Sequence, residues 1–341
     1  MNQQIRNSPE TRQGIEPRLD PEGLFDLRYR AFLETVSHLR VRLHRYCARM
    51  TGSALDGEDI MQEALFEAYR KIGLLDDTQA LRPWLFRIAH NKCIDFIRTR
   101  RTRLKAEAGY ASDEIVLPVE PAGAGAGRAI ERLVVHLPPK ERACVLLKDV
   151  FDHSLEEIAG LVGSTSGGVK SALNRGRAKL AALPAQPVAA PAHDPELERL
   201  LSRYVELFNA RDWDGVRALT SADARLRVSD CYNGLLSDSP YFVEYEHGEP
   251  WRMRPDTIEG EAVLVVDRRH GELWRPAYFV RVHADGGVID RIADYYACPW
   301  ILEMVFGDAE RGGAFPSPQG GEGKKRSLRI VKDNADRVAH A

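Results

Sequence analysis

Residues 153–184, HSLEEIAGLVGSTSGGVKSALNRGRAKLAALP, have the pattern of two short helices joined by a tight turn. Ser154 and Glu157 have the spacing of a capping box at the start of the first helix. Gly163 suits the left-handed residue that ends this helix, and Ser164 suits the N-cap of the second. The predicted apolar face of the first helix consists of Leu155, Ile158, Ala159 and Val162, and the predicted inward residues of the second helix are Val169, Ala172, Leu173 and Leu180. The pattern therefore predicts a helix-turn-helix.

The second helix of this pair carries unbalanced positive charge, because no acid lies between Ser164 and Pro184. Helix-turn-helix proteins place such a helix in the major groove of DNA. A helical hairpin with a solvated basic face fits the stretch equally well, so the rest of the chain must decide. The outward residues are Lys170, Ser171, Asn174, Arg175, Arg177 and Lys179.

The composition is that of an ordinary globular chain with several domains. The chain has 341 residues, of which 44% are hydrophobic and 29% charged, and at roughly 150 residues per domain we expect two or three domains. It contains no apolar run of membrane-spanning length and no secretory signal. Five dispersed cysteines suit reduced, mostly buried thiols in a cytoplasmic protein, and we expect no metal or cofactor. The net charge of −2 does not by itself indicate nucleic acid.

Shifts in composition divide the chain into domains and linkers. Residues 24–50 have helical spacing, which predicts one long helix or two with a break, and residues 51–59 are predicted to form a turn. The expected segments are a flexible tail (1–22), a helical domain (23–105), an acidic Gly-Ala linker (106–130), the helix-turn-helix domain (131–184), a Pro/Ala linker (185–193), an α+β domain (194–307) and a second flexible tail (308–341).

Residues 58–72, EDIMQEALFEAYRKI, form an amphipathic helix with an acidic face. A solvated surface is the simplest interpretation of this face, and a docking surface for a basic partner helix is the functional one. The polar residues of the face are Asp56, Glu58, Asp59, Gln62, Glu63 and Glu67.

Residues 82–105 form a basic helix, with eight Lys or Arg and one acid, Asp95. Pro83 suits the first turn. An amide and several guanidinium groups on one face can contact phosphates and base edges, although a basic helix end also suits the helix dipole. At 100° per residue, a sector of about 80° holds Arg87, Asn91, Arg98 and Arg101.

From residue 194 the pattern changes from helices to strands. Helices followed by alternating strands predict an α+β domain with helices packed on a curved antiparallel sheet. The predicted strands are ARLRVS (224–229), YFVEYEH (241–247), AVLVVD (262–267), AYFVRVHA (277–284) and GVIDRIADYY (287–296).

Three segments, in this order, resemble regions two and four of a bacterial RNA polymerase sigma factor of the extracytoplasmic-function (ECF) type. They are DGEDIMQEALFEAYRK (56–71), RPWLFRIAHNKCIDFIRTRR (82–101) and LPPKERACVLLKDVFDHSLEEIAGLVGSTSGGVKSALNRGRAKL (137–180). Residues 194–306 resemble the SnoaL-like cone fold. The resemblance therefore implies two all-α sigma domains followed by a cone-shaped α+β domain.

The resemblance implies that core RNA polymerase and promoter DNA are the partners. Asn91 would lie at a flipped-out base of the −10 element, and the acidic linker would run through polymerase near the RNA path. The implied polymerase-binding residues are Asp56, Asp59, Gln62 and Glu63. The implied −10 residues are Arg87, Asn91, Lys92, Arg98, Arg100, Arg101 and Arg103. The implied −35 residues are Lys170, Ser171, Asn174, Arg175, Arg177 and Lys179.

Two departures from the family pattern concern the −35 helix. Gly167-Gly168 stands where Gly-Thr is usual, so we expect a weakly formed first turn, since glycine costs up to about 1 kcal/mol relative to alanine. Ala172 stands where a basic residue is common, so we expect one DNA contact fewer.

The resemblance also implies that the cone touches the sigma regions and regulates them in place of a separate anti-sigma protein. One alternative is a helix-turn-helix regulator with a ligand-sensing cone, independent of polymerase, which leaves residues 56–101 unexplained. Another is an enzyme with a pocket in the cone, although we expect no catalysis. Its acid or base candidates are Asp230, His247, Asp294 and Tyr295.

Overall fold

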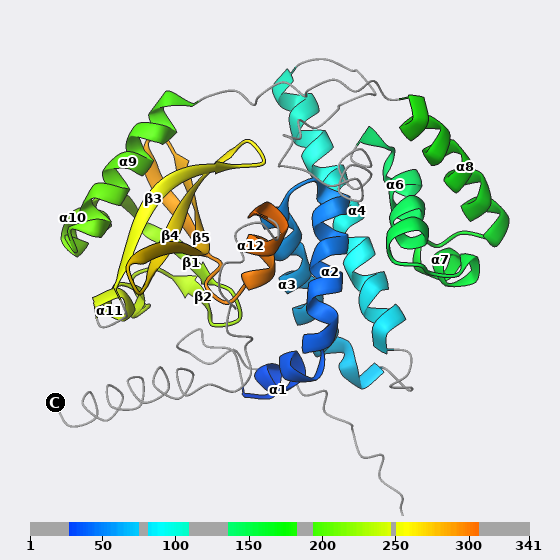
Figure 1. Cartoon of the computed structure of the whole chain (residues 1–341), viewed down its shortest axis with the longest axis horizontal. Coiled ribbons are helices and arrows are strands. Elements are labelled where there is room, and N and C mark those ends of the chain that lie inside the picture. The colour runs from blue at the N-terminus through cyan, green and yellow to red at the C-terminus, as the bar shows by residue number, and fades with distance from the viewer. Residues whose placement is uncertain (1–26, 75–80, 109–135, 183–193, 247–249, 307–341) are drawn as a thin grey trace, which may run out of the picture. The chain divides into compact units, whose positions relative to one another are not determined.

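The computed structural model describes residues 27–74, 81–108, 136–182, 194–246 and 250–306 (Figure 1). Both predicted tails, most of the acidic linker and the whole Pro/Ala linker lie outside these residues. The first domain consists of α1 (Leu27–Thr35), α2 (Ser37–Thr51), α3 (Ala54–Lys71), the single turn η1 (Ile72–Leu74) and α4 (Leu81–Ala108). The 24–50 segment is thus two helices with a break, and α4 continues three residues beyond the predicted domain boundary.

Helix α3 begins earlier than predicted, and the turn expected over 51–59 is wrong beyond Ser53. The side chain of Ser53 caps the helix by accepting a hydrogen bond from the Asp56 amide at 3.1 Å. Gly57 then allows α3 to lie directly against α2, because a Cβ at Gly57 would be 2.4 Å from the Ala48 nitrogen. Close packing against α2 therefore fixes the start of α3 and the position of its acidic residues.

The second domain contains the predicted helix-turn-helix. Its elements are α6 (Pro139–Val145), the π-helical turn η4 (Leu146–Val150), α7 (Leu155–Leu161) and α8 (Ser166–Ala182). The capping box of Ser154 and Glu157 is present, and Gly163 has the left-handed conformation with φ +61°.

Two expectations for α8 are wrong. Thr165 rather than Ser164 caps the helix, since the Thr165 hydroxyl accepts from the Gly168 amide at 3.1 Å. With this cap, Gly167 and Gly168 are both helical. Ala172 is completely buried, so it lies in the core and does not mark a missing DNA contact.

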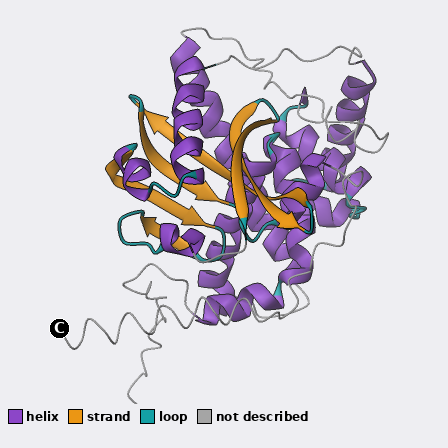
Figure 2. Cartoon of the chain, turned by 60° about the vertical axis from the view of Figure 1, so that its left-hand side comes forward, coloured by secondary structure: helices purple, strands orange, loops and turns teal. Residues whose placement is uncertain are grey.

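The third domain is α+β, as predicted. Its helices are α9 (Pro195–Asn209), α10 (Trp213–Ala218), α11 (Tyr241–Glu246) and α12 (Pro299–Phe306). Its strands are β1 (Thr220–Val228), β2 (Tyr232–Leu235), β3 (Trp251–Ile258), β4 (Glu261–His270), β5 (Leu273–Asp285) and β6 (Val288–Asp294). They form one curved sheet in the order β2-β1-β6-β5-β4-β3 (Figure 2).

Two details of this domain differ from the sequence prediction. The sheet is mixed, because β1 and β6 pair in parallel while the other neighbours are antiparallel. Tyr241–Glu246 is helix α11, not a strand. Tyr241, Phe242 and Tyr245 are all buried, and this i, i+1, i+4 spacing is that of one helix face.

The two faces of the sheet pack against different partners. Leu264, Val266 and Val280 belong to the core that the sheet forms with α9, α10 and α11. The neighbouring residues Val265 and Phe279 point to the other face and belong to the same core cluster as the two N-terminal helical domains. All described residues lie in one compact unit, Met1–Phe306.

Candidate functional site

The acidic face of α3 is in contact with the C-terminal domain. Asp59 accepts a hydrogen bond from the Tyr295 hydroxyl at 2.9 Å and forms an ion pair with Arg227. Asp56 accepts from Arg281 Nη1 at 2.9 Å. Two of the four residues assigned to polymerase binding are therefore already bonded within this chain.

Arg281 on β5 is the central cation of this contact. Its side chain is 4% exposed and it bonds to Asp56, to Asp59 at 3.3 Å and to Glu261 at 2.5 Å. Burial lowers the pKa of Arg281, but Tyr295, Glu261 and Asp56 raise it by more, so the guanidinium stays charged. Burial also raises the pKa of Tyr295 to about 12, so its hydroxyl keeps the proton that it donates to Asp59.

Glu58 is completely buried between α3 and α12, although the sequence placed it on the solvated face. Its carboxylate accepts from the Trp300 indole at 2.7 Å, from the Cys298 thiol at 3.2 Å and from Gln62 Nε2 at 2.7 Å. Gln62 is thus buried as well, whereas the Glu63 side chain is 61% exposed. Of the four polymerase-binding candidates, Glu63 alone lies at the surface without a partner from the C-terminal domain among the described residues.

The β3–β4 turn contacts the first residue of α3. The Glu259 carboxylate accepts from the Ala54 amide at 2.6 Å. Glu259 and Gly260 have φ +50° and +79°, the two positive φ angles of a type I′ turn. Burial raises the pKa of Glu259, and the Ala54 hydrogen bond opposes that shift. The contact satisfies an amide that has no intrahelical acceptor.

The −10 candidates occupy more than one side of α4. Arg87, Asn91, Arg98 and Arg101 are exposed and lie within about 80° of one another around the helix. Lys92 instead faces α3, where it pairs with Glu67 at 3.1 Å, and Arg100 pairs with Asp56 at 3.3 Å. Arg103 is exposed about 160° from Arg87. The structure therefore brings together four of the seven candidates.

All six −35 candidates are exposed on α8. Three of them are ion-paired with acids of the preceding elements. Arg175 and Lys179 each lie 2.9 Å from Glu141, and Arg177 lies 2.5 Å from Asp149. Burial raises the pKa of Glu141, but its hydrogen bonds from Lys179 and Arg175 outweigh burial and lower it.

The two helical domains also pack on each other through aromatic rings. The ring centroids of Phe86 on α4 and Phe151 after η4 are 6.0 Å apart, and those of Tyr46 and Phe151 are 5.9 Å apart. His153 lies 5.6 Å from Phe86. Residues of both domains therefore share one core cluster.

The enzyme candidates do not converge. Asp230 pairs with Arg40 of α2, and Tyr295 bonds to Asp59, so both face the first domain. Asp294 lies on the opposite face of the sheet, where it accepts from Tyr241 and Tyr245 at 2.9 and 2.8 Å. His247 lies outside the described residues.

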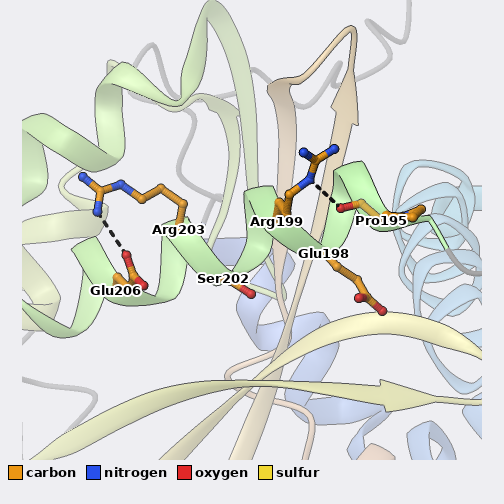
Figure 3. Close-up of a pocket in the computed structure, with 6 residues that line it drawn as sticks. All are labelled: Pro195, Glu198, Arg199, Ser202, Arg203 and Glu206. Atoms are coloured by element: carbon orange, nitrogen blue, oxygen red, sulfur yellow. Dashed lines mark hydrogen bonds and ion pairs between the residues drawn. The ribbon is translucent and has the colours of Figure 1, made fainter.

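A shallow hollow lies on the outer side of α9, and no candidate residue lines it (Figure 3). All its lining residues come from this one helix, and Arg203 pairs along the helix with Glu206 at 3.0 Å. The described part of the chain contains no group of three or more potential metal ligands. Among the described helices, none is long and apolar enough to cross a membrane.

The sequence matches two models of sigma-factor domains. Residues 35–103 match Sigma-70 region 2, and residues 127–180 match Sigma-70, region 4. The first match contains α2, α3 and most of α4, and the second contains the helix-turn-helix. These matches define the class, an RNA polymerase sigma factor.

One curated relative is similar over most of its length. The ECF RNA polymerase sigma factor SigG of Mycobacterium tuberculosis is 33% identical over 294 residues, which cover 76% of this chain and 78% of SigG. The chain belongs to the ECF RNA polymerase sigma factors, which direct transcription initiation. Since the two sigma regions make up less than half of the chain, the similarity to SigG extends into the C-terminal domain.

Two solved structures are similar in part. The crystal structure of the M. tuberculosis ECF sigma factor SigJ has 18% sequence identity and a TM-score of 0.31, and the match covers 77% of this chain and 95% of SigJ. A putative polyketide cyclase from a Silicibacter species has 19% identity and a TM-score of 0.25, covering 33% of this chain and 97% of the cyclase.

The sequence prediction missed the residues of the C-terminal domain that contact α3. Arg227 and Arg281 lie on strands that were predicted, but their partners are more than 160 positions away and no local pattern marks the pairing. Helix α12 was detectable, because PWILEMVF is a compact apolar run after the last strand.

Proposed function

We propose that the C-terminal domain holds this sigma factor in a closed form that cannot engage core RNA polymerase through α3. The observation that carries the proposal is the bonding of Asp56 and Asp59 to Arg227, Arg281 and Tyr295. Family resemblance assigns the same two carboxylates to the polymerase clamp. One carboxylate face cannot serve both partners at once, so polymerase must displace the C-terminal domain.

The apolar part of the contact makes the closed form stable. Trp300, Ile301 and Leu302 of α12 are buried in the same cluster as α3. The guanidinium of Arg40 on α2 also lies 4.7 Å from the Trp300 ring centroid, a cation–π distance. Burying such side chains favours docking by about 1.5–3 kcal/mol each. Release therefore needs a signal or competition from polymerase.

The packing of the two helical domains supports a closed form for a second reason. The −10 and −35 elements are about 25 base pairs apart, which is roughly 80 Å of duplex. Phe86 beside Phe151 and His153 keeps the two DNA-binding domains in direct contact. We expect this contact to break before both elements are bound.

For the open form we assign promoter contacts by exposure. Asn91, with Arg87, Arg98 and Arg101 on the same side of α4, would meet the −10 element, and α8 would meet the −35 element. Lys92 and Arg100 lie on other sides of α4, where they pair with Glu67 and Asp56 of α3, and are left out of this assignment. Of the polymerase-binding set, Asp56 and Asp59 become available on release, whereas Gln62 supports Glu58 from within the core.

Run-off transcription with core polymerase tests the proposal on the full-length chain. The template is the promoter upstream of the protein's own gene. Arg227→Glu places an acid against Asp59 and should open the contact, so transcription should rise above the wild-type level. Arg225→Glu makes the same charge change on an exposed residue of the same strand, and transcription should stay at the wild-type level. Equal transcription from wild type and Arg227→Glu would count against a closed form.

A further inference from the structure

The exposed face of α8 has a neutral centre between two charged edges. Gly167, Ser171, Asn174 and Ala178 are all exposed. Their i, i+4, i+7, i+11 spacing places them within about 60° around the helix. These are the residues of α8 that point most directly away from its core residues, which are Val169, Ala172, Leu173 and Gly176. A groove-bound α8 would therefore meet the floor of the groove with this stripe.

Charged residues lie on both sides of the neutral stripe, and acids hold them there. On one side, Arg175 and Lys179 share Glu141, whose side chain is 8% exposed. On the other side, Arg177 makes two hydrogen bonds to Asp149, at 3.1 and 2.5 Å. The side chains of the three cations are 50–57% exposed. Each cation is thus directed sideways, toward the position that a phosphate backbone takes beside a groove-bound helix.

Close packing of α6 and α8 produces one of these edges. A Cβ at Gly176 would lie 2.9 Å from Val145 Cγ2 and 3.5 Å from the Glu141 Cβ. Glycine at this position therefore lets α6 approach α8 until Glu141 reaches both Arg175 and Lys179.

The hydrogen-bonding groups of the stripe are short and differ in what they offer a base. The Ser171 hydroxyl donates to the Gly167 carbonyl at 3.0 Å, so toward DNA it presents lone pairs. Asn174 has an amide, which pairs with adenine N6 and N7 through two hydrogen bonds. Gly167 has no side chain to project toward the duplex. Its surroundings within the protein are also open, since a Cβ there would meet no atom nearer than 4.0 Å.

We infer that Asn174 is the base-reading residue of α8 and selects an adenine in the −35 element. Arg175 and Lys179 on one edge, with Arg177 on the other, bind the phosphates that flank the groove. Glu141 and Asp149 are positioning residues for those cations. The inference rests on the proposed role of α8 at the −35 element, and it narrows six candidate residues to one that determines specificity.

Selection from a random DNA library with core polymerase tests this assignment. The full-length protein and core polymerase are bound to duplexes with a randomised upstream segment, and the retained fragments are sequenced. The same selection is run with the Arg227→Glu chain, so that the closed form does not limit binding. Asn174→Ala should lose the preference for adenine at one position by about fivefold or more, whereas Asn174→Gln, which keeps the amide, should retain part of it.

Arg177→Gln is the matched comparison for a phosphate contact. It should weaken binding to all fragments alike and leave base preferences unchanged. The slope of log affinity against log salt concentration should fall by about one, as expected for the loss of one phosphate contact. Arg199→Gln, on α9, should change neither quantity.

Four outcomes would overturn the inference. Two of them concern Asn174→Ala: equal weakening of binding to all fragments, and an adenine preference that is unchanged from the wild type. A shift in base preference with Arg177→Gln would contradict the phosphate role. If neither the wild type nor Arg227→Glu enriches any sequence with polymerase, the −35 role of α8 fails, and the inference fails with it.

Discussion

Tyr295 donates its hydroxyl to Asp59 at 2.9 Å, although the two residues are 236 positions apart in the chain. Tyr295 follows directly after β6 of the C-terminal sheet, and Asp59 lies on α3, the helix that we propose docks on polymerase. The pair therefore connects the C-terminal domain to the surface that we propose it controls.

The Tyr295 bond should be measurable through the Ala54 amide, whose acceptor is Glu259 of the C-terminal domain. Removing a hydrogen bond to a charged group costs about 1.5–3 kcal/mol. Tyr295→Phe should therefore open the contact more often and speed exchange of the Ala54 amide hydrogen by about tenfold or more. Tyr296→Phe, at a half-exposed neighbour, is the control and should have no such effect. An Ala54 exchange rate unchanged by Tyr295→Phe would mean that this bond does not hold the domains together.

Trp300→Phe should lower the thermal midpoint of the full chain. The substitution keeps an aromatic ring but removes the indole N–H that Glu58 accepts at 2.7 Å. A buried carboxylate that loses a donor costs about 1–3 kcal/mol. Trp274→Phe, at a partly exposed site beneath Arg252, should change the midpoint much less. Equal midpoints for the two variants in thermal unfolding would show that the Glu58 contact contributes little.

The stability of the C-terminal domain should depend on pH through Asp294. Burial raises the pKa of Asp294 from its usual 3.8 to about 6, against the opposing hydrogen bonds from Tyr245 and Tyr241. The folded state therefore takes up this proton at a higher pH than the unfolded state does, and ionisation of Asp294 opposes folding. The resulting penalty is fully present above pH 6 and disappears as the pH falls toward 4; it amounts to roughly 3 kcal/mol.

Thermal unfolding of wild type and Asp294→Asn between pH 5 and 8 isolates this contribution. Relative to the variant, the wild type should become more stable as the pH falls from 7 to 5, while the difference should stay constant between pH 7 and 8. A difference that is the same at pH 5 and pH 7 would contradict a buried, ionising Asp294.

Gly57→Ala should destabilise the first domain strongly. The added Cβ would meet the backbone of Ala48 at 2.4–2.5 Å, so α2 and α3 would have to separate. Overpacking of this kind costs about 1–3 kcal/mol or more. At Gly160, on the exposed side of α7, a Cβ meets nothing within 4 Å, so Gly160→Ala should be neutral or stabilising by up to about 1 kcal/mol. Thermal midpoints of the two variants test this. A midpoint for Gly57→Ala equal to that of the wild type would contradict the close approach of α3 to α2.

Local patterns predicted the elements but not the contacts between domains. The capping box at Ser154 and the glycine turn at Gly163 follow from neighbouring residues, and the structure has both. For residues 24–50 the sequence left one helix or two open, and the structure has two. The strand predicted over Tyr241–His247 failed because the three aromatics, at positions i, i+1 and i+4, fit one face of a short helix. In that case tertiary packing decides between the two periods.

The candidate site shows the same division. Exposure of Asn91 and Asn174 followed from helical periodicity, because the opposite sides of α4 and α8 are apolar. The burial of Glu58 did not, because the residues that bond to its carboxylate, Cys298 and Trp300, are about 240 positions away. Nothing in the acidic face of α3 itself indicates that its partner lies in the same chain.

The affinity of core RNA polymerase for the full-length chain tests the central claim most directly. Wild type, Arg227→Glu and the control Arg225→Glu are compared by equilibrium binding at one salt concentration. If the C-terminal domain covers the docking face of α3, Arg227→Glu should bind polymerase more tightly than wild type, and Arg225→Glu should bind like wild type. Equal or weaker binding of Arg227→Glu, with the protein still folded, would contradict the account.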